Sequence, residues 1–329
     1  MSVEYSIVIP TYNSAKTLAG LLDSIQKQRF ANFEVIVVDD NSSDGTLGIA
    51  SRYDCKVFSL KKNRGAAYAR NYGAQKASGN ILIFFDSDVI LYEDVLKRIH
   101  ERLSKDKMPV LIGMYSGEPA NKGFIPEFKA LQEEVWYSRI PSNKATPFTP
   151  YVGIIRKDLF LSLGGFDVKY KDADVEDYEF TIKLMKKVPN IYLDREIKVK
   201  HHFPGIKKLV RSYFRRCFLW TEIFLKRMTF ETNGTTSRQG MIHIMYVLSV
   251  LFLIASFFFR HILWIAVVFL AAGLFLDSDF IKLVFREKGV IFTFRVILLN
   301  IILSFVVVVA AIAGFIYHGF KLLIKGGEL

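Results

Sequence analysis

The chain has 329 residues, a formal net charge of +12 and a hydrophobic fraction of 51%. That hydrophobic fraction excludes a disordered chain, and it is high for a protein that is soluble throughout. The chain has two cysteines, which excludes a disulfide scaffold, and we expect Cys55 and Cys217 to be reduced and structural.

The chain begins with the pattern of a strand, a loop and a helix. Tyr5 to Pro10 is a short apolar run, and apolar residues recur at helical spacing between Ser14 and Gln28. The loop has no glycine, which excludes a dinucleotide fingerprint and a P-loop. Thr11 and Tyr12 can offer backbone groups and a ring to a nucleotide base, or serve only as turn residues. No basic region precedes an apolar core here, so we expect no signal peptide.

A polar loop follows the second predicted strand. Glu34 to Val38 (EVIVV) is the second predicted buried strand, and residues 39–46 after it are seven polar residues and one glycine. Such a loop at a strand end is a plausible ligand site. Asp39 can accept a hydrogen bond from the imide N–H of uracil or from a ribose hydroxyl, whereas Asp44 is placed to cap the helix that starts near Thr46.

The next elements are an edge strand, a helix and a strongly apolar strand. The edge strand covers residues 57–60, and the helix reaches about Ala77 and carries Arg70. We expect Arg70 to reach Asp86 or a phosphate, with an ordinary surface arginine as the alternative. Residues 81–85 are an uninterrupted apolar run, which is typical of a strand buried on both faces of a parallel sheet.

Acidic residues stand where this strand ends. Asp86, Ser87 and Asp88 follow it directly, and ligands of open α/β sheets bind beyond the carboxyl ends of the strands. Two carboxylates one residue apart can share a divalent cation, and oxygen ligands suit Mg²⁺ or Mn²⁺ held on phosphates. The alternative is that Asp86 caps the next segment and that Asp88 is solvated.

Four segments of the chain, in order, resemble the nucleotide-binding half of family 2 glycosyltransferases with the GT-A fold. They are YSIVIPTYN, EVIVVDDNSSDGT, NRGAAYARNYGA and ILIFFDSD. The resemblance implies a Rossmann-like α/β domain with a mostly parallel sheet over residues 1–203. It implies a nucleotide-diphosphate sugar as donor, with UDP preferred and GDP possible. The donor would be bound by Pro10, Thr11, Tyr12, Asp39, Arg70, Asp86 and Ser87.

Within this resemblance the residues have separate roles. Asp39 would contact the base, Arg70 the diphosphate or Asp86, and Asp86 the ribose or the sugar. Asp88 would hold a divalent cation, Mg²⁺ or Mn²⁺, with Asp86 as a possible additional ligand. The cation would offset charge on the leaving diphosphate.

The second half of the predicted domain resembles the acceptor segment of these enzymes. The run Leu163 to Asp167 (LGGFD) is followed by Glu176 and Asp177 at the head of a helix. In the family, the Asp of such a pair takes the general-base role, so the resemblance assigns that role to Asp177 and makes Glu176 a further candidate. By residue type alone, both would simply favour the N-terminus of the helix.

Two histidines follow the last predicted strand of this domain. Many family members place a histidine there, as a third metal ligand or a phosphate contact, and the Val-x-His spacing points to His201 over His202. A neutral imidazole suits manganese. The alternative is a pair of histidines at a turn near the membrane.

The rest of the chain is predicted to attach to a membrane. Residues 195–240 contain 11 basic and 3 acidic residues, a net charge of +8, and apolar residues three and four apart predict interfacial helices over residues 204–238. A basic stretch next to apolar spans favours anionic lipid over nucleic acid as its partner. Residues 239–329 form a predicted transmembrane region of two to three helices.

Three uncharged apolar runs make up this transmembrane region. They are Met241–Phe259, Ile262–Leu276 and Val296–Tyr317. The first and third are long enough to cross a bilayer, whereas the second needs tilt, bilayer thinning or a hairpin shared with the first. We expect a loop at residues 277–289 on the inner side. Three full spans would then place Lys321 and Lys325 outside, against the positive-inside tendency, so the side of the C-terminus stays open.

These features together predict a membrane-anchored, inverting, metal-dependent glycosyltransferase of the inner cell membrane with a cytoplasmic catalytic domain. Its acceptor would be a hydroxyl of a lipid or lipid-linked molecule.

One alternative is a polyprenyl-phosphate sugar synthase, whose phosphate acceptor needs no base; the Gly-Gly-Phe-Asp and Glu-Asp elements argue against it. Another is a nucleotidyltransferase, which would need a glycine-rich N-terminal loop. A third is a non-catalytic membrane-anchored binding module, which four retained aspartates (Asp39, Asp86, Asp88 and Asp177) argue against.

Overall fold

The computed structural model describes residues 3–106, 108–143, 147–169, 176–227 and 237–324. The chain divides into two compact units, Met1–Phe203 and Pro204–Leu329. In the described residues, the first unit is an α/β fold and the second is helical.

One sheet organises the first unit, with the strand order β3-β2-β1-β4-β7-β6-β8-β5. The strands are β1 (Tyr5–Thr11), β2 (Phe33–Asp39), β3 (Lys56–Ser59), β4 (Ile81–Phe85), β5 (Val89–Leu91), β6 (Val110–Tyr115), β7 (Val152–Arg156) and β8 (Tyr192–His201). β1 to β4 run parallel, as do β6 and β8, whereas β7 is antiparallel to both its neighbours and β5 is antiparallel to β8. The predicted α/β class with a mostly parallel sheet is confirmed.

The prediction for residues 81–85 needs one correction. β4 is buried as expected, and it pairs in parallel with β1. Its other neighbour is β7, which runs antiparallel to it. An uninterrupted apolar run reports that both faces of a strand are covered, and it carries no information about the direction of the neighbouring strand.

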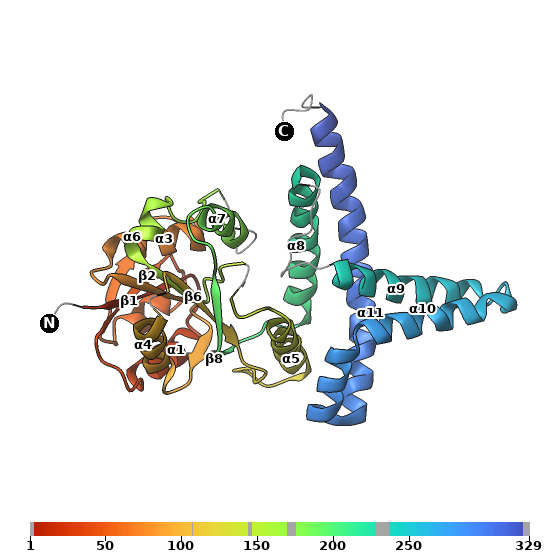
Figure 1. Ribbon diagram of the computed structural model, residues 1–329, viewed down its shortest axis with the longest axis horizontal. Coiled ribbons are helices and arrows are strands. Elements are labelled where there is room, and N and C mark those ends of the chain that lie inside the picture. Colours follow the sequence, from red (N-terminus) through yellow and green to blue (C-terminus); the bar gives the residue numbers. More distant parts are fainter. Residues whose placement is uncertain (1–2, 107, 144–146, 170–175, 228–236, 325–329) are drawn as a thin grey trace. The chain divides into compact units, whose positions relative to one another are not determined.

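Helices cover both faces of this sheet (Figure 1). The helices are α1 (Leu18–Gln26), α2 (Thr46–Ala50), α3 (Ala66–Lys76), α4 (Val95–Asp106), α5 (Phe124–Ser138), α6 (Lys157–Ser162) and α7 (Glu176–Met185). Side chains alternate along β1, so Ile7 and Ile9 join a core with α1 and α4 while Val8 joins a second core with α3, α6 and α7. The sheet is therefore the middle layer of three.

The strand order reverses between β1 and β4. From β1 the chain adds β2 and β3 on one side and then crosses to place β4 on the other. The pairing of β1 with β4 ends at Val8 and Phe84, and further along β1 the imide nitrogen of Pro10 has no hydrogen to donate. In open α/β sheets the ligand crevice lies at the carboxyl ends of strands at such a reversal. The residues after β1 and β4 are therefore the place to look for a site.

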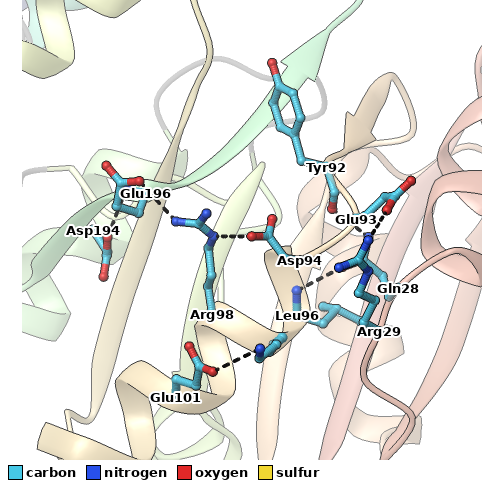
Figure 2. Close-up of polar contacts among 11 residues, drawn as sticks. Gln28, Arg29, Tyr92, Glu93, Asp94, Leu96, Arg98, Glu101, Asp194 and Glu196 are labelled. Carbon is cyan, nitrogen blue, oxygen red and sulfur yellow. Dashed lines mark hydrogen bonds and ion pairs between the residues drawn. The ribbon is translucent and has the colours of Figure 1, made fainter.

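A group of polar contacts holds the chain that leaves β4 and β5 (Figure 2). Gln28 donates from Nε2 to the carbonyl of Tyr92 at 2.8 Å, and its Oε1 accepts the N–H of Leu96 at 3.0 Å. It thereby satisfies a backbone donor at the start of α4 that the helix itself leaves without a partner. Arg98 of α4 reaches Glu196 of β8 at 3.0 Å. These contacts tie the segment after the Asp86–Asp88 triplet to the residues that follow α1 and to β8.

The second unit consists of α8 (Ile206–Arg227), α9 (Ser237–Ala255), the 3₁₀ turn η1 (Arg260–Ile262), α10 (Leu263–Leu276) and α11 (Ser278–Ile324) in its described residues. α9 and α10 lie side by side as a hairpin (Figure 1). Two stretches, Ser237–Ala255 and Ser278–Lys321, are long and apolar enough to cross a membrane, and the helical stretch Arg260–Leu276 is shorter. Membrane attachment by this unit stays a prediction.

The expected loop at residues 277–289 is wrong. α11 begins at Ser278, and its helical geometry is interrupted only at Gly289, which has φ 78° and ψ −177°. Charged residues in this stretch suggested a loop, but helices tolerate charges readily on an exposed face. Glycine at residue 289 supplies the left-handed φ that the interruption requires.

The basic helix α8 packs along α11. Cys217 Sγ lies 3.3 Å from the carbonyl of Val307, and Glu222 approaches His318 Nδ1 at 3.6 Å. The predicted interfacial region 204–238 is described at residues 204–227 and 237–238, and its remainder lies outside the described residues.

Candidate functional site

Asp39 and Thr11 meet at the ends of two neighbouring strands, β2 and β1. Asp39 is 2% exposed and accepts the N–H of Ser42 at 3.1 Å and the hydroxyl of Ser59 at 3.4 Å. Thr11 Oγ1 lies 3.5 Å from Asp39 Oδ1. The structure thus brings these two predicted donor residues together, and the serines hold the Asp39 carboxylate in one orientation.

Asp40 is a second buried carboxylate, which sequence reasoning did not single out. Its two oxygens accept the N–H groups of Arg64 at 2.8 Å and Gly65 at 2.7 Å. Burial raises the pKa of Asp40, and the two N–H groups act in the opposite direction. Asp40 therefore anchors the start of α3, the helix that carries Arg70. The available signal was the Asp-Asp doublet at a strand end, followed by an Asn-Arg-Gly helix start.

The loops after β1 and β2 interlock. Asn13 and Asn41 have φ values of 49° and 64°, a left-handed conformation that asparagine tolerates better than most residues. Asn13 donates its N–H to Ser42 Oγ at 2.9 Å, and its side-chain oxygen accepts the N–H of Ser43 at 2.9 Å. Pro10 is buried within β1, whereas Tyr12 is 52% exposed. The Tyr12 ring is thus accessible directly after the carboxyl end of β1.

Asp44 and Ser87 complete this loop network. Asp44 Oδ1 accepts the N–H of Thr46, the first residue of α2, at 3.0 Å. This contact agrees with the expected capping role, although Asp44 lies one position before the N-cap residue. The hydroxyl of Ser87 lies 2.7 Å from that of Ser14. The loop after β4 is therefore joined to the loop after β1.

Arg70 connects the segment after β4 to the start of α7. It is 2% exposed, and its guanidinium lies 2.7 Å from Asp86 Oδ1 and 3.3 Å from Glu176 Oε1. Burial alone would lower the pKa of Arg70, but Asp86 and Glu176 raise it above its ordinary value. The guanidinium therefore stays charged. The expected contact with Asp86 is confirmed, and the surface-arginine alternative is wrong.

Asp88 and His201 come together through the pairing of β5 with β8, in which Val89 faces His201. Asp88 Oδ1 lies 3.3 Å from His201 Nε2, with 39% of the Asp88 side chain and 14% of the histidine side chain exposed. The other ring nitrogen of His201, Nδ1, is buried without a hydrogen-bond partner among the described residues. His202 donates its backbone N–H to the Asp88 carbonyl at 2.9 Å, and burial lowers the pKa of its ring.

This pair fits a divalent cation. A carboxylate oxygen and a neutral imidazole are suitable ligands for Mn²⁺, and Mg²⁺ accepts the carboxylate. Among the residues that the structure describes, no group of three His, Cys, Asp or Glu side chains is placed to hold an ion. Cations on nucleotides take their remaining ligands from phosphates and water, so two protein ligands are sufficient.

An aromatic row supports the His201 ring. Tyr115 of β6 stacks on Tyr151 with ring centroids 3.9 Å apart and lies 4.4 Å from the His201 centroid. Burial raises the pKa of Tyr115 well above its ordinary value, and the nearby charges of Asp86 and Asp88 raise it further. Sequence reasoning missed Tyr115, because a tyrosine inside an apolar strand carries no local sign of a polar neighbour.

Asp177 and Glu176 begin α7 and differ in exposure. Glu176 is 3% exposed and is held by Arg70, whereas Asp177 is partly exposed and its Oδ1 accepts the N–H of Tyr178 at 2.9 Å. The acidic first turn also suits the positive end of the helix dipole. Asp177 is thus the more accessible carboxylate of the two. Its general-base role stays a prediction.

Comparison with known proteins identifies the first unit. Residues 6–156 match the family model of glycosyl transferase family 2. An uncharacterized glycosyltransferase of Haemophilus influenzae is 29% identical over 187 residues, which cover 55% of this chain and 62% of that protein. The UDP-Glc:alpha-D-GlcNAc-diphosphoundecaprenol beta-1,3-glucosyltransferase WfgD of Escherichia coli is 32% identical over 141 residues, or 42% of this chain and 55% of that protein. The chain thus spans less than two thirds of the length of either relative.

A solved structure agrees in fold. The mannosyltransferase PcManGT of Pyrobaculum calidifontis, solved with GDP-Man and Mn²⁺, superposes with a TM-score of 0.57. The two chains are 16% identical, and the match covers 96% of this chain and 88% of the other. At that identity the likeness concerns the fold, and it agrees with the predicted GT-A architecture.

Proposed function

We propose, from the premise that residues 6–156 are a family 2 glycosyltransferase domain, that this protein transfers a sugar from a nucleoside diphosphate to a hydroxyl group of a lipid-linked acceptor. The observation that carries the proposal is the contact between Asp88 and His201, made where β5 pairs with β8. Two residues 113 positions apart meet there beside Asp86 and its buried partner Arg70. A nucleotide with its cation needs such a set of groups.

The donor would occupy the crevice in a defined order. Asp39 and Thr11 would contact the base, with UDP our preferred nucleotide, and the exposed Tyr12 ring would lie against it. Asp86 would contact the ribose or the sugar. A bound Mg²⁺ or Mn²⁺ held by Asp88 and His201 would offset negative charge on the leaving diphosphate.

The acceptor side would rely on Asp177. Its carboxylate takes the proton of the acceptor hydroxyl as that oxygen attacks the anomeric carbon. The bond from this carbon to the diphosphate breaks, and the nucleoside diphosphate leaves with the electron pair. Attack from the opposite face inverts the anomeric configuration. The WfgD relative is named for a diphosphoundecaprenol acceptor, which supports a lipid-linked acceptor here.

Donor turnover by the purified full-length protein tests this proposal. With a panel of UDP- and GDP-sugars, we expect release of one nucleotide that requires Mn²⁺ or Mg²⁺. Asp88→Ala should lower this release by about two orders of magnitude or more, because charge on the leaving group is no longer offset. Asp94→Asn, which removes a partly exposed carboxylate paired with Arg98, serves as the control. Equal, metal-independent release by Asp88→Ala would contradict the cation role.

We also propose that the second unit anchors the protein in the inner cell membrane and that the catalytic domain lies in the cytosol. α9 has 19 residues and would span about 28 Å, close to the hydrocarbon thickness of a bilayer. Phe257 and Phe258, at the turn of the α9–α10 hairpin, are 81% and 80% exposed. Arg238 at the start of α9 donates to the carbonyl of Leu276 at 2.9 Å, which joins the two helices at the other end of the hairpin.

Cysteine labelling in membrane vesicles tests the hairpin. With Cys55 and Cys217 replaced by serine, Phe258→Cys should react with an impermeant maleimide from the side of the membrane opposite to Asp279→Cys. The reason is that the turn and the base of a spanning hairpin face different compartments. Labelling of both cysteines from one side would show that the hairpin does not cross. A protein that stays soluble without detergent would contradict anchoring altogether.

A further inference from the structure

Asn71 holds the backbone of Phe166 with both ends of its side-chain amide. Asn71 Oδ1 accepts the N–H of Phe166 at 2.9 Å, and Asn71 Nδ2 donates to the carbonyl of the same residue at 2.8 Å. Both backbone polar groups of a single residue are thus paired by one side chain. Because Asn71 lies on α3, this contact ties α3 to the LGGFD segment, 95 residues away in the chain.

The two glycines before Phe166 make this contact possible. Gly164 and Gly165 have φ values of 76° and 69°, a left-handed conformation that glycine adopts at little cost. A Cβ on Gly165 would also overlap Asn71 Oδ1. The Gly-Gly pair and Asn71 therefore form one structural device, which we call the α3 clamp.

The Phe166 ring extends this device to α7. It is 2% exposed and lies 4.8 Å from the Phe180 ring of α7 and 5.3 Å from the Phe160 ring of α6. Arg70, the residue before Asn71, holds Glu176 at the first position of α7. α3 thus reaches α7 directly through Arg70 and indirectly through Asn71 and the Phe166 ring, at two points four residues apart on α7.

We infer that Asn71 is a positioning residue for the acceptor half of the reaction: the α3 clamp sets the place of α7, and hence of Asp177, relative to the donor carboxylate Asp86. Arg70 and Asn71 are adjacent on one helix, so the donor side and the acceptor side share a single rigid support. A base that is displaced by about 1 Å loses much of its rate advantage. This inference rests on the proposed function.

Kinetics of Asn71→Ala and of the near-isosteric Asn71→Asp in the full-length protein test the inference. We expect kcat/KM for a hydroxyl acceptor to fall by about 10- to 100-fold, while the Kd of the nucleotide stays within about twofold, because only the acceptor side is displaced. Gln75→Ala, an exposed change on the same helix, is the matched control and should alter neither quantity. A loss of nucleotide affinity as large as the loss of transfer would overturn the inference, as would unchanged transfer.

Hydrogen exchange gives a readout that needs no substrate. The Phe166 N–H should exchange about tenfold faster or more in Asn71→Ala than in wild type. In Asn71→Asp, which keeps an acceptor oxygen, the increase should be smaller. Unchanged exchange in Asn71→Ala would overturn the clamp itself. Failure of wild type to turn over any nucleotide sugar would instead overturn the proposed function, while the exchange result would still decide whether Asn71 holds Phe166.

Discussion

Replacing Asp177 by asparagine is expected to lower the rate of sugar transfer by a factor of about 10² to 10⁴, the usual range for removal of a general base. The amide keeps the shape of the side chain and can still accept the N–H of Tyr178, so the start of α7 should stay intact. What it loses is the ability to take a proton from the acceptor hydroxyl. The measurement is the rate of transfer to acceptor under saturating donor, together with the Kd of the nucleotide, which should not change.

Glu179→Gln is the matched control for Asp177→Asn. Glu179 lies in the same acidic first turn of α7, so its replacement removes one negative charge from the same helix end. We expect little effect on transfer. If Asp177→Asn transfers sugar as fast as wild type, and a lipid phosphate serves as acceptor for both, the protein is a polyprenyl-phosphate sugar synthase and Asp177 is not its base.

Replacing Arg70 by methionine is expected to lower the free energy of unfolding by about 3–5 kcal/mol, because it removes the cation between two carboxylates. Glu176 is 3% exposed and would be left as a buried charge without Arg70. Asp86, whose side chain is 29% exposed, would lose its guanidinium partner at 2.7 Å. Transfer activity should fall as well, since one of these carboxylates lies in the proposed donor site. Denaturant unfolding of the detergent-solubilised protein measures the stability change.

Arg156→Met is the control for the stability effect. Arg156 also pairs with a carboxylate, Asp158, but both side chains are more than 60% exposed. An exposed pair contributes about 0–1 kcal/mol, so this variant should unfold almost as wild type does. Adding Glu176→Gln to Arg70→Met should recover part of the loss, because the buried negative charge is then gone. Equal unfolding of the Arg70 and Arg156 variants would show that the buried triad contributes no special stability.

The donor side and the acceptor side of the proposed site are held in place by different structural elements. The donor side is built from loops after β1, β2 and β4, which interlock through Asn13, Ser42 and Ser14. The acceptor side is held in place by α3, through the contacts of Arg70 with Glu176 and of Asn71 with Phe166. A change within the first group should therefore alter nucleotide binding, and a change at Asn71 should alter acceptor use. This separation is what allows the proposed donor and acceptor roles to be tested independently.

The amino-acid sequence by itself determined the elements that depend on short-range patterns. The largely apolar strands β1, β2 and β4, the polar residues that end them, and the helical apolar stretches of the second unit are all local features. Their order along the chain was sufficient for the resemblance to family 2 glycosyltransferases, which the family match over residues 6–156 agrees with. Local patterns also misled at residues 278–288, where charged side chains on a helix suggested a loop, and at residues 81–85, where one neighbouring strand is antiparallel.

Only the tertiary structure decided which side chains meet. Arg70 and Glu176 are 106 residues apart, and Asn71 and Phe166 are 95 apart. Those contacts depend on α6 and α7 packing on the same face of the sheet as α3. The contact between Asp88 and His201 likewise depends on β8 pairing with the short strand β5. Residue type and spacing report on neighbours within a few positions, whereas a contact between distant segments is set by the order of the strands in the sheet and by the helices that pack on it. The sequence therefore indicated the chemistry of the site, and the fold decided its partners.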